Sequence, residues 1–122
     1  MKKVIVLLLL IAFSLSVNSN CRRYANVKYM TSSGWSKKYY VQVNFLTGYE
    51  LNQATSSFNY SSYSKYAVIF WGDDQATVIK LNTPLICGME ITCDCLDNVY
   101  TDLVGYDQDG DKWNICMNDY CY

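Results

Sequence analysis

The sequence contains no histidine, and this absence excludes several kinds of chemistry. Histidine is the commonest general base near neutral pH, a frequent zinc ligand and the partner of serine or cysteine nucleophiles. Two carboxylates acting as acid and base remain an enzymatic alternative. The only glutamates, however, are Glu50 and Glu90, and most aspartates stand in turn-like stretches, where Asx hydrogen bonds account for them. We therefore expect a protein that is not an enzyme and uses no cofactor.

Proline and glycine are also scarce, with one proline, Pro84, and six glycines. No Gly/Ser-rich linker, charge block or internal repeat divides the chain. The residues after position 19 number 103, which suits a single domain whose core is small enough to need covalent support. We therefore predict one domain over residues 20–122.

The N-terminus has the pattern of a secretory signal peptide. Lys2 and Lys3 precede an uninterrupted apolar run at residues 4–13, which is followed by polar residues. The run is too short for a membrane-spanning helix, which needs about 20 apolar residues. The small residues near position 19 suit cleavage there, so residues 1–19 are predicted to be a signal peptide and the mature chain to lack a transmembrane segment.

Cysteine use agrees with a secreted or periplasmic location. The chain has an even set of six cysteines, which in an exported protein predicts up to three disulfides whose pairing is left open. Most of them fall in the C-terminal third, so Cys21 is expected to tie the N-terminus to that part. A lipid anchor on Cys21 is the alternative, but the residues before it lack the usual lipidation signal. The predicted disulfide residues are Cys21, Cys87, Cys93, Cys95, Cys116 and Cys121.

The pair Cys93 and Cys95 also allows a redox or copper-binding interpretation. Two cysteines close together in a secreted chain are more simply structural half-cystines with different partners. We therefore expect no redox or metal function from them.

Alternation of apolar and polar residues predicts strands. Residues 39–45 alternate strictly, and the apolar runs at 66–71 and 76–81 form the strongest predicted hairpin. No window shows the apolar stripe of a helix. About eight short strands predict an all-β fold, a small antiparallel sandwich or barrel. Further strands are expected at 24–30, 49–54, 90–96, 100–106 and 111–116, with a surface loop at 55–64.

Three aspartates spaced by two resemble a calcium-binding loop, since hard cations prefer clustered carboxylates. Aligned on Gly110, however, the first and last EF-hand positions fall on Gly105 and Cys116 instead of Asp and Glu. We therefore predict a hairpin turn and no metal, with a weak calcium site as the alternative. The three residues are Asp107, Asp109 and Asp111.

The charge is unevenly distributed. After removal of residues 1–19 the chain has 8 basic and 11 acidic residues, a formal net charge of −3, which does not indicate nucleic-acid binding. Residues 20–80 hold 7 basic and 3 acidic groups, whereas residues 81–122 hold one basic and 8 acidic groups. Such asymmetry affects the choice of partner more than the fold.

Aromatic residues are abundant, with 12 tyrosines and 3 tryptophans. Tyrosine is favoured in strands by propensity alone, but it also serves well at recognition surfaces and in sugar stacking. Two groups of aromatics lie outside the obvious core pattern, and we predict a binding surface among them. These candidates are Trp35, Tyr39, Tyr40, Phe58, Tyr60 and Tyr63.

One stretch carries a family resemblance. The sequence FWGDDQAT at residues 70–77 is similar to a hairpin in small secreted inhibitors of C-type lysozyme, which are disulfide-bearing β-barrels. The resemblance implies a β-hairpin and keeps inhibition of an external hydrolase as a candidate function. The serine-glycine loop that those inhibitors use has no clear counterpart at 55–64.

The leading hypothesis is therefore a secreted or periplasmic, non-enzymatic binding module that recognises an extracellular protein or glycan. Inhibition of an external hydrolase is one version of it. The alternative, from a different class, is a structural, surface-layer or lipoprotein component of the cell envelope, which would self-associate.

Overall fold

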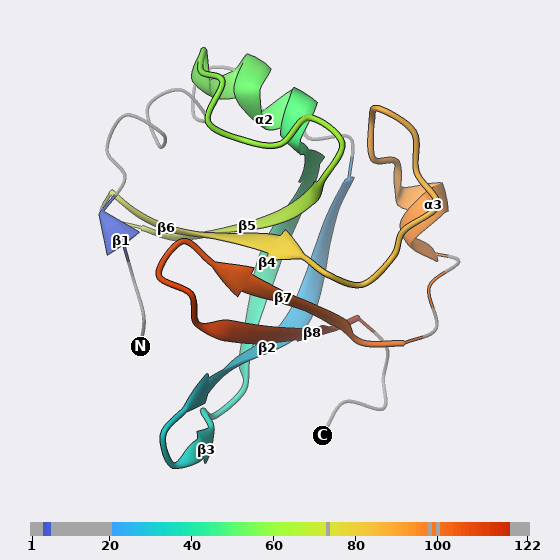
Figure 1. Ribbon diagram of the computed structural model, residues 1–122. Coiled ribbons are helices and arrows are strands. Elements are labelled where there is room, and N and C mark those ends of the chain that lie inside the picture. Colours follow the sequence, from blue (N-terminus) through green and yellow to red (C-terminus); the bar gives the residue numbers. More distant parts are fainter. Residues whose placement is uncertain (1–3, 6–20, 73, 98, 100, 118–122) are drawn as a thin grey trace.

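The computed structural model describes residues 4–5, 21–72, 74–97, 99 and 101–117 (Figure 1). Most of the predicted signal peptide and Cys121 lie outside these residues. The strands are β1 (Val4–Ile5), β2 (Cys21–Thr31), β3 (Gly34–Trp35), β4 (Tyr39–Thr47), β5 (Lys65–Gly72), β6 (Gln75–Leu81), β7 (Leu103–Asp107) and β8 (Lys112–Cys116), and the helices are α2 (Gly48–Thr55) and α3 (Cys93–Asp97).

Six of the strands close into an antiparallel barrel, which confirms the predicted fold class. Their order around the barrel is β6, β5, β4, β2, β8 and β7, and β7 pairs back with β6. Each strand pairs with its neighbours in sequence except where β2, the first of the six, meets β8, the last. Val27 of β2 stands opposite Ile115 of β8. Closure gives most backbone groups of these strands a partner on both sides.

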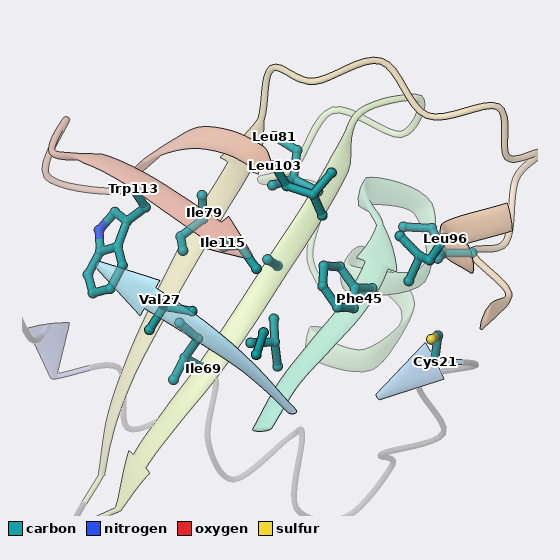
Figure 2. Packing of buried hydrophobic residues seen from close by; sticks show 14 of the residues in the cluster. Cys21, Val27, Phe45, Ile69, Ile79, Leu81, Leu96, Leu103, Trp113 and Ile115 are labelled. Atoms are coloured by element: carbon teal, nitrogen blue, oxygen red, sulfur yellow. The ribbon is translucent and has the colours of Figure 1, made fainter. Parts of the chain in front are cut away.

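The barrel interior is filled by apolar side chains from alternate positions of the strands (Figure 2). In β2, for example, Ala25, Val27 and Tyr29 are buried while the residues between them point outward. Trp113 and Phe45 are the largest side chains without any exposed surface. The described residues inside the barrel therefore form a packed hydrophobic core.

A second, smaller core lies on the outside of the barrel wall. It consists of Leu46, Leu51, Tyr66, Val68 and Val78, with Tyr60 packed against it. Leu51 comes from α2, which Figure 1 shows lying against one end of the barrel together with the loop that follows it. The helix and this loop therefore cover the outer face of β5 and β6.

The seam between β6 and β7 is short and is extended by a side chain. The two strands pair only at Ile79, Lys80 and Leu81 of β6. Beyond this point the Val78 N–H donates to Oε1 of Gln108 at 3.0 Å, and Nε2 of Gln108 donates to the Ala76 carbonyl at 3.3 Å. The amide of Gln108 thus replaces one further step of strand pairing.

Residues 49–54 were predicted to be a strand, and this prediction is wrong. They form α2, which begins with a capping box: the Thr47 side chain accepts from the Glu50 N–H at 3.1 Å, and the Thr47 N–H donates to Oε1 of Glu50 at 2.9 Å. A threonine followed three residues later by glutamate is a recognised helix start. The helix is amphipathic over only two turns, so it has no long apolar stripe.

The strand predicted at 90–96 is also wrong. Residues 93–97 form the short helix α3, and the chain before it lacks regular structure from residue 82 to 92. Instead of a strand ladder, two disulfides hold this segment, Cys21–Cys93 and Cys87–Cys95. Cys93 and Cys95 therefore have different partners, and Cys21 joins the C-terminal third, as predicted. Cys116 is disulfide-bonded as well.

The remaining strand predictions at 24–30, 39–45, 66–71, 76–81, 100–106 and 111–116 are confirmed within a few residues, as is the loop at 55–64. Neither helix within the described ranges is long and apolar enough to cross a membrane. The disulfides suit an oxidising, extracytoplasmic compartment.

Candidate functional site

The predicted aromatic residues fall into two separate regions. Trp35, Tyr39 and Tyr40 lie on β3 and β4, while Phe58, Tyr60 and Tyr63 lie in the loop after α2. Figure 1 shows this loop and β3 at opposite ends of the barrel. The two predicted groups therefore do not form one site.

Tyr40 forms an exposed aromatic pair with Tyr24. Their ring centroids are 5.4 Å apart and their planes differ by 24°. Tyr24 is opposite Gln42 and Asn26 is opposite Tyr40 in the β2–β4 register, so the two tyrosines are diagonal neighbours on one outer face. Their side chains are 58% and 69% exposed. Two stacked tyrosine rings are thus presented to solvent on a rigid barrel wall.

Trp35 extends this outer face. It pairs with Met30 across the β2–β3 hairpin, and both side chains are partly exposed. The ammonium group of Lys28 lies 5.1 Å from the centroid of the Trp35 ring, a cation–π contact that holds both side chains on the surface. We call the group formed by Tyr24, Lys28, Met30, Trp35 and Tyr40 the aromatic face.

Tyr39 has a different role from its neighbour Tyr40. It is half-buried and packs between Tyr29, at 6.4 Å, and Trp71, at 5.8 Å, with ring planes nearly parallel to the first and nearly perpendicular to the second. Strand alternation sends Tyr39 inward and Tyr40 outward. Tyr39 therefore contributes to the core at one end of the barrel and not directly to the aromatic face.

Hydrogen bonds fix the hairpin that carries Trp35. The Thr31 hydroxyl donates to the Gly34 carbonyl at 2.7 Å and accepts from the Ser33 N–H at 3.1 Å. The Ser36 hydroxyl accepts from the Tyr29 N–H at 3.0 Å, and the Ser36 N–H donates to the Tyr29 carbonyl at 2.7 Å. We call residues 28–40 the arm: its two ends are paired in the barrel wall, and Figure 1 shows the hairpin with β3 projecting from the barrel. The conformation of this hairpin is therefore stabilised by hydrogen bonds within the chain itself.

The loop after α2 divides its three aromatics between surface and core. Phe58 and Tyr63 are 98% and 78% exposed, whereas Tyr60 packs edge-on against Tyr66 at 5.4 Å. Burial, and then repulsion by Tyr66, raise the pKa of Tyr60 above the ordinary value of 10. Tyr60 therefore belongs to the second core, and only Phe58 and Tyr63 are available at the surface.

Two surface cavities border this region. One of about 340 Å³ is lined by Tyr60, Tyr66, Val78, Lys80, Tyr106, Asp107 and Gln108. The other, of about 550 Å³, is lined by Tyr49, Asn52, Gln53, Ser56, Ser57, Phe58 and Ser62. Both are open to solvent; the first contains one acidic side chain, Asp107, and the second contains three serines, Ser56, Ser57 and Ser62.

The three aspartates considered for calcium do lie together, with one carboxylate oxygen of each within 4.8 Å of the others. Asp107, however, is buried, and its oxygens already accept hydrogen bonds from the backbone N–H groups of Asp109 and Asp111 and from the Trp113 indole. This pattern is that of an Asx turn closing the β7–β8 hairpin. The calcium alternative therefore stays a prediction.

The prediction omitted Tyr24, Lys28 and Met30, which the structure adds to the exposed surface. A signal for them exists in the sequence. In β2 they alternate with the apolar residues Ala25 and Val27, so the outward face could have been assigned once the strand was accepted. Their proximity to Tyr40 and Trp35 depends on strand pairing, which alternation does not reveal.

Comparisons of the chain with protein-family models, curated proteins and solved structures found no match. The resemblance of residues 70–77 to lysozyme inhibitors therefore stays a prediction. The described residues of that stretch lie in β5 and β6 and around the turn between them, as the resemblance implied.

Proposed function

We propose that the protein is a secreted, non-enzymatic binding module whose aromatic face contacts an extracellular protein or glycan. The observation that carries the proposal is the solvent-exposed stack of Tyr24 on Tyr40. When a partner covers large exposed aromatic side chains, their apolar surface is removed from water, and this favours binding. Tyrosine also loses little conformational entropy on binding because it has few rotatable bonds.

The position of the stack supports this function. α2 and the loop after it cover the outer side of β5 and β6, while the outer side of β2 and the first half of β4 carries exposed side chains. The disulfides and the predicted signal peptide support a location outside the cytoplasm, where extracellular partners are found. Inhibition of an external hydrolase is one form that such binding can take.

Secretion is tested by the intact mass of the exported protein, with and without reduction and alkylation. A mass beginning at Asn20 supports a processed, secreted protein. A mass that begins at Cys21 and includes acyl chains indicates a lipoprotein, and retention of residues 1–19 contradicts the secretion part of the proposal.

Binding is tested by capturing partners from extracellular fractions and on a glycan array with the exported protein. The double variant Tyr24→Ser/Tyr40→Ser should lose a protein or glycan that the wild type retains. The matched control is Tyr49→Ser/Tyr106→Ser, which removes two tyrosines that are each 42% exposed elsewhere. Equal capture by wild type and the Tyr24/Tyr40 variant, or no capture at all, would contradict the proposal.

A further inference from the structure

We propose that the cavity over the seam between β6 and β7 binds a small aromatic carboxylate. This cavity has a volume of about 340 Å³. In the strand order of the barrel, the seam lies on the opposite side from β2 and β4, which carry the Tyr24–Tyr40 stack. The proposal therefore adds a second site and does not depend on the function proposed for the aromatic face. Three features carry it: an uncompensated lysine, tyrosine walls and a size that suits one ring.

Strand register places a lysine between two tyrosines. Lys80 of β6 stands opposite Tyr66 of β5 on one side and opposite Tyr106 of β7 on the other. Directly opposed residues of neighbouring antiparallel strands present their side chains on the same face of the sheet. All three residues line the cavity, and Lys80 is exposed. A ligand in the cavity therefore meets the ammonium group together with aromatic side chains.

The charge of Lys80 is not compensated within the described part of the chain, where its ammonium group has no ion pair or hydrogen bond. Asp107 also lines the cavity, but Oδ2 of its carboxylate accepts from the Trp113 indole in the core. Its Oδ1 accepts from the N–H groups of Asp109 and Asp111. Neither of these two aspartates lines the cavity. Lys80 is thus the charged group of the lining that is available to a ligand.

Tyrosine rings form the walls of the cavity. Tyr60 packs edge-on against Tyr66 with ring centroids 5.4 Å apart, and Tyr106 is 42% exposed. Burial, and then repulsion by Tyr66, raise the pKa of Tyr60, so its phenol stays uncharged near neutral pH and does not compete for the lysine. Aromatic rings prefer offset or edge-to-face contact with another ring. The walls therefore favour a ligand that contains an aromatic ring.

The remaining polar side chain of the lining is the Gln108 amide, and both of its ends are engaged. Oε1 accepts from the Val78 N–H, and Nε2 donates to the Ala76 carbonyl. The volume is near the lower end of the range for small-molecule sites, about 300–1,000 Å³. A phosphate group is usually held by several donors at once, whereas one ammonium group matches one carboxylate. Size and charge together therefore select a single ring that bears one carboxylate.

The experiment is an NMR titration of the exported protein with three probes that separate charge from ring. Phenylacetate has both, phenylacetamide has the ring without the charge, and acetate has the charge without the ring. We expect saturable shifts of the backbone N–H signals around the cavity, with a Kd for phenylacetate of about 1 mM. Phenylacetamide should bind about tenfold more weakly, and acetate should not saturate. Added salt should weaken the binding of phenylacetate and not that of phenylacetamide.

Two substitutions test the location. Lys80→Gln should weaken phenylacetate binding by about tenfold and change phenylacetamide binding by less than about twofold, because only the charge is lost. Tyr106→Ser should weaken the binding of both probes by about fivefold, because it removes one aromatic wall. The matched control Lys37→Gln removes the same charge from the arm and should change the Kd of phenylacetate by less than about twofold. Thermal unfolding shows whether each variant is folded.

Several results would overturn the proposal. These are the absence of saturable shifts around the cavity, equal Kd values for phenylacetate and phenylacetamide, and equal weakening by Lys80→Gln and Lys37→Gln. Shifts confined to the aromatic face would overturn it as well. Lys80 and Tyr106 lie outside the aromatic face, so the capture experiment with the Tyr24/Tyr40 variant tests the proposed function separately. Either proposal can therefore fail while the other stands.

Discussion

The indole N–H of Trp113 donates a hydrogen bond to Oδ2 of Asp107, with 2.8 Å between nitrogen and oxygen. The ring fills the barrel and has no exposed surface, while the carboxylate closes the β7–β8 turn. Oδ1 of Asp107 accepts from the backbone N–H groups of Asp109 and Asp111, both at 2.9 Å. One buried carboxylate therefore connects the largest core residue to the conformation of a surface turn.

Replacement of this carboxylate should be strongly destabilising. Asp107→Ala leaves the indole N–H and two backbone N–H groups without their acceptor, and we expect the free energy of unfolding to fall by about 3 kcal/mol. Urea denaturation followed by Trp fluorescence measures this loss. The exposed Asp109 supplies the control, since Asp109→Ala should cost less than about 0.5 kcal/mol. Equal losses in the two variants would show that the hydrogen bonds of Asp107 are not what stabilises the turn.

Glu50 connects the start of α2 to the irregular segment before α3. Its Oε1 accepts from the N–H of Thr47 at 2.9 Å and of Ile91 at 3.1 Å. Glu50→Ala should lower the free energy of unfolding by about 2 kcal/mol, because it removes half of the capping box and the acceptor of a second N–H. Hydrogen exchange should show faster exchange at the Ile91 amide. Glu50→Gln keeps an oxygen acceptor and should lose less of the free energy of unfolding than Glu50→Ala. Gln53→Ala, at an exposed position of the same helix, is the control.

The two disulfides whose cysteines are both among the described residues should contribute unequally to stability. Cys21 and Cys93 are separated by 72 positions, Cys87 and Cys95 by 8. In the chain-entropy description, the longer loop stabilises by about 4 kcal/mol and the shorter by about 2.5 kcal/mol. Denaturation in urea compares the double variants Cys21→Ala/Cys93→Ala and Cys87→Ala/Cys95→Ala. The first variant should lose more of the free energy of unfolding than the second. The reverse order would indicate that the short bridge acts mainly by holding α3 in place.

Alkaline pH should reveal the burial of Tyr60. Burial, and then Tyr66, raise its pKa above 10, so in the folded protein Tyr60 keeps its proton at a pH where the unfolded chain has released it. The stability that Tyr60 contributes is present below about pH 10 and is lost as pH rises from there toward its folded pKa. Stability of Tyr60→Phe, which keeps the ring, should fall less steeply than wild type above pH 10. The ultraviolet difference titration of the two proteins should have a midpoint above 10; a midpoint at or below 10 would contradict the assigned burial.

Where alternation was strong, the sequence was sufficient to locate the strands. Residues 39–45 and the hairpin at 66–81 bury one or both faces of their strands. The pattern of apolar and polar residues along these strands therefore follows from their place in the barrel. Residues 49–54 were misassigned because the helix is only two turns long and its start signal, Thr47 with Glu50, lies partly in the preceding strand. The segment at 90–96 is held by disulfides and not by strand pairing. The spacing of apolar residues in the sequence does not reveal which cysteines are bonded.

The candidate site was predictable only in part. Trp35 and Tyr40 were identified as exposed aromatics, but Tyr39 and Tyr60 proved to pack in the two cores. Exposure of a tyrosine depends on which neighbour covers it, and this is decided by strand pairing and by the position of α2. The stack of Tyr24 on Tyr40 joins residues from different strands, so a one-dimensional pattern contains no signal for it.

The pairing of β2 with β8 has a consequence for how the chain is made. These are the first and last strands of the barrel, and Cys21 at the start of β2 is also bonded to Cys93. Because the chain is synthesised from its N-terminal side, β2 lacks its second neighbour until β8 has been made. Contacts between such distant residues form slowly, and the waiting strand exposes apolar side chains and unpaired backbone groups in the meantime. The first barrel strand to be synthesised is therefore among the last to be paired along both of its edges.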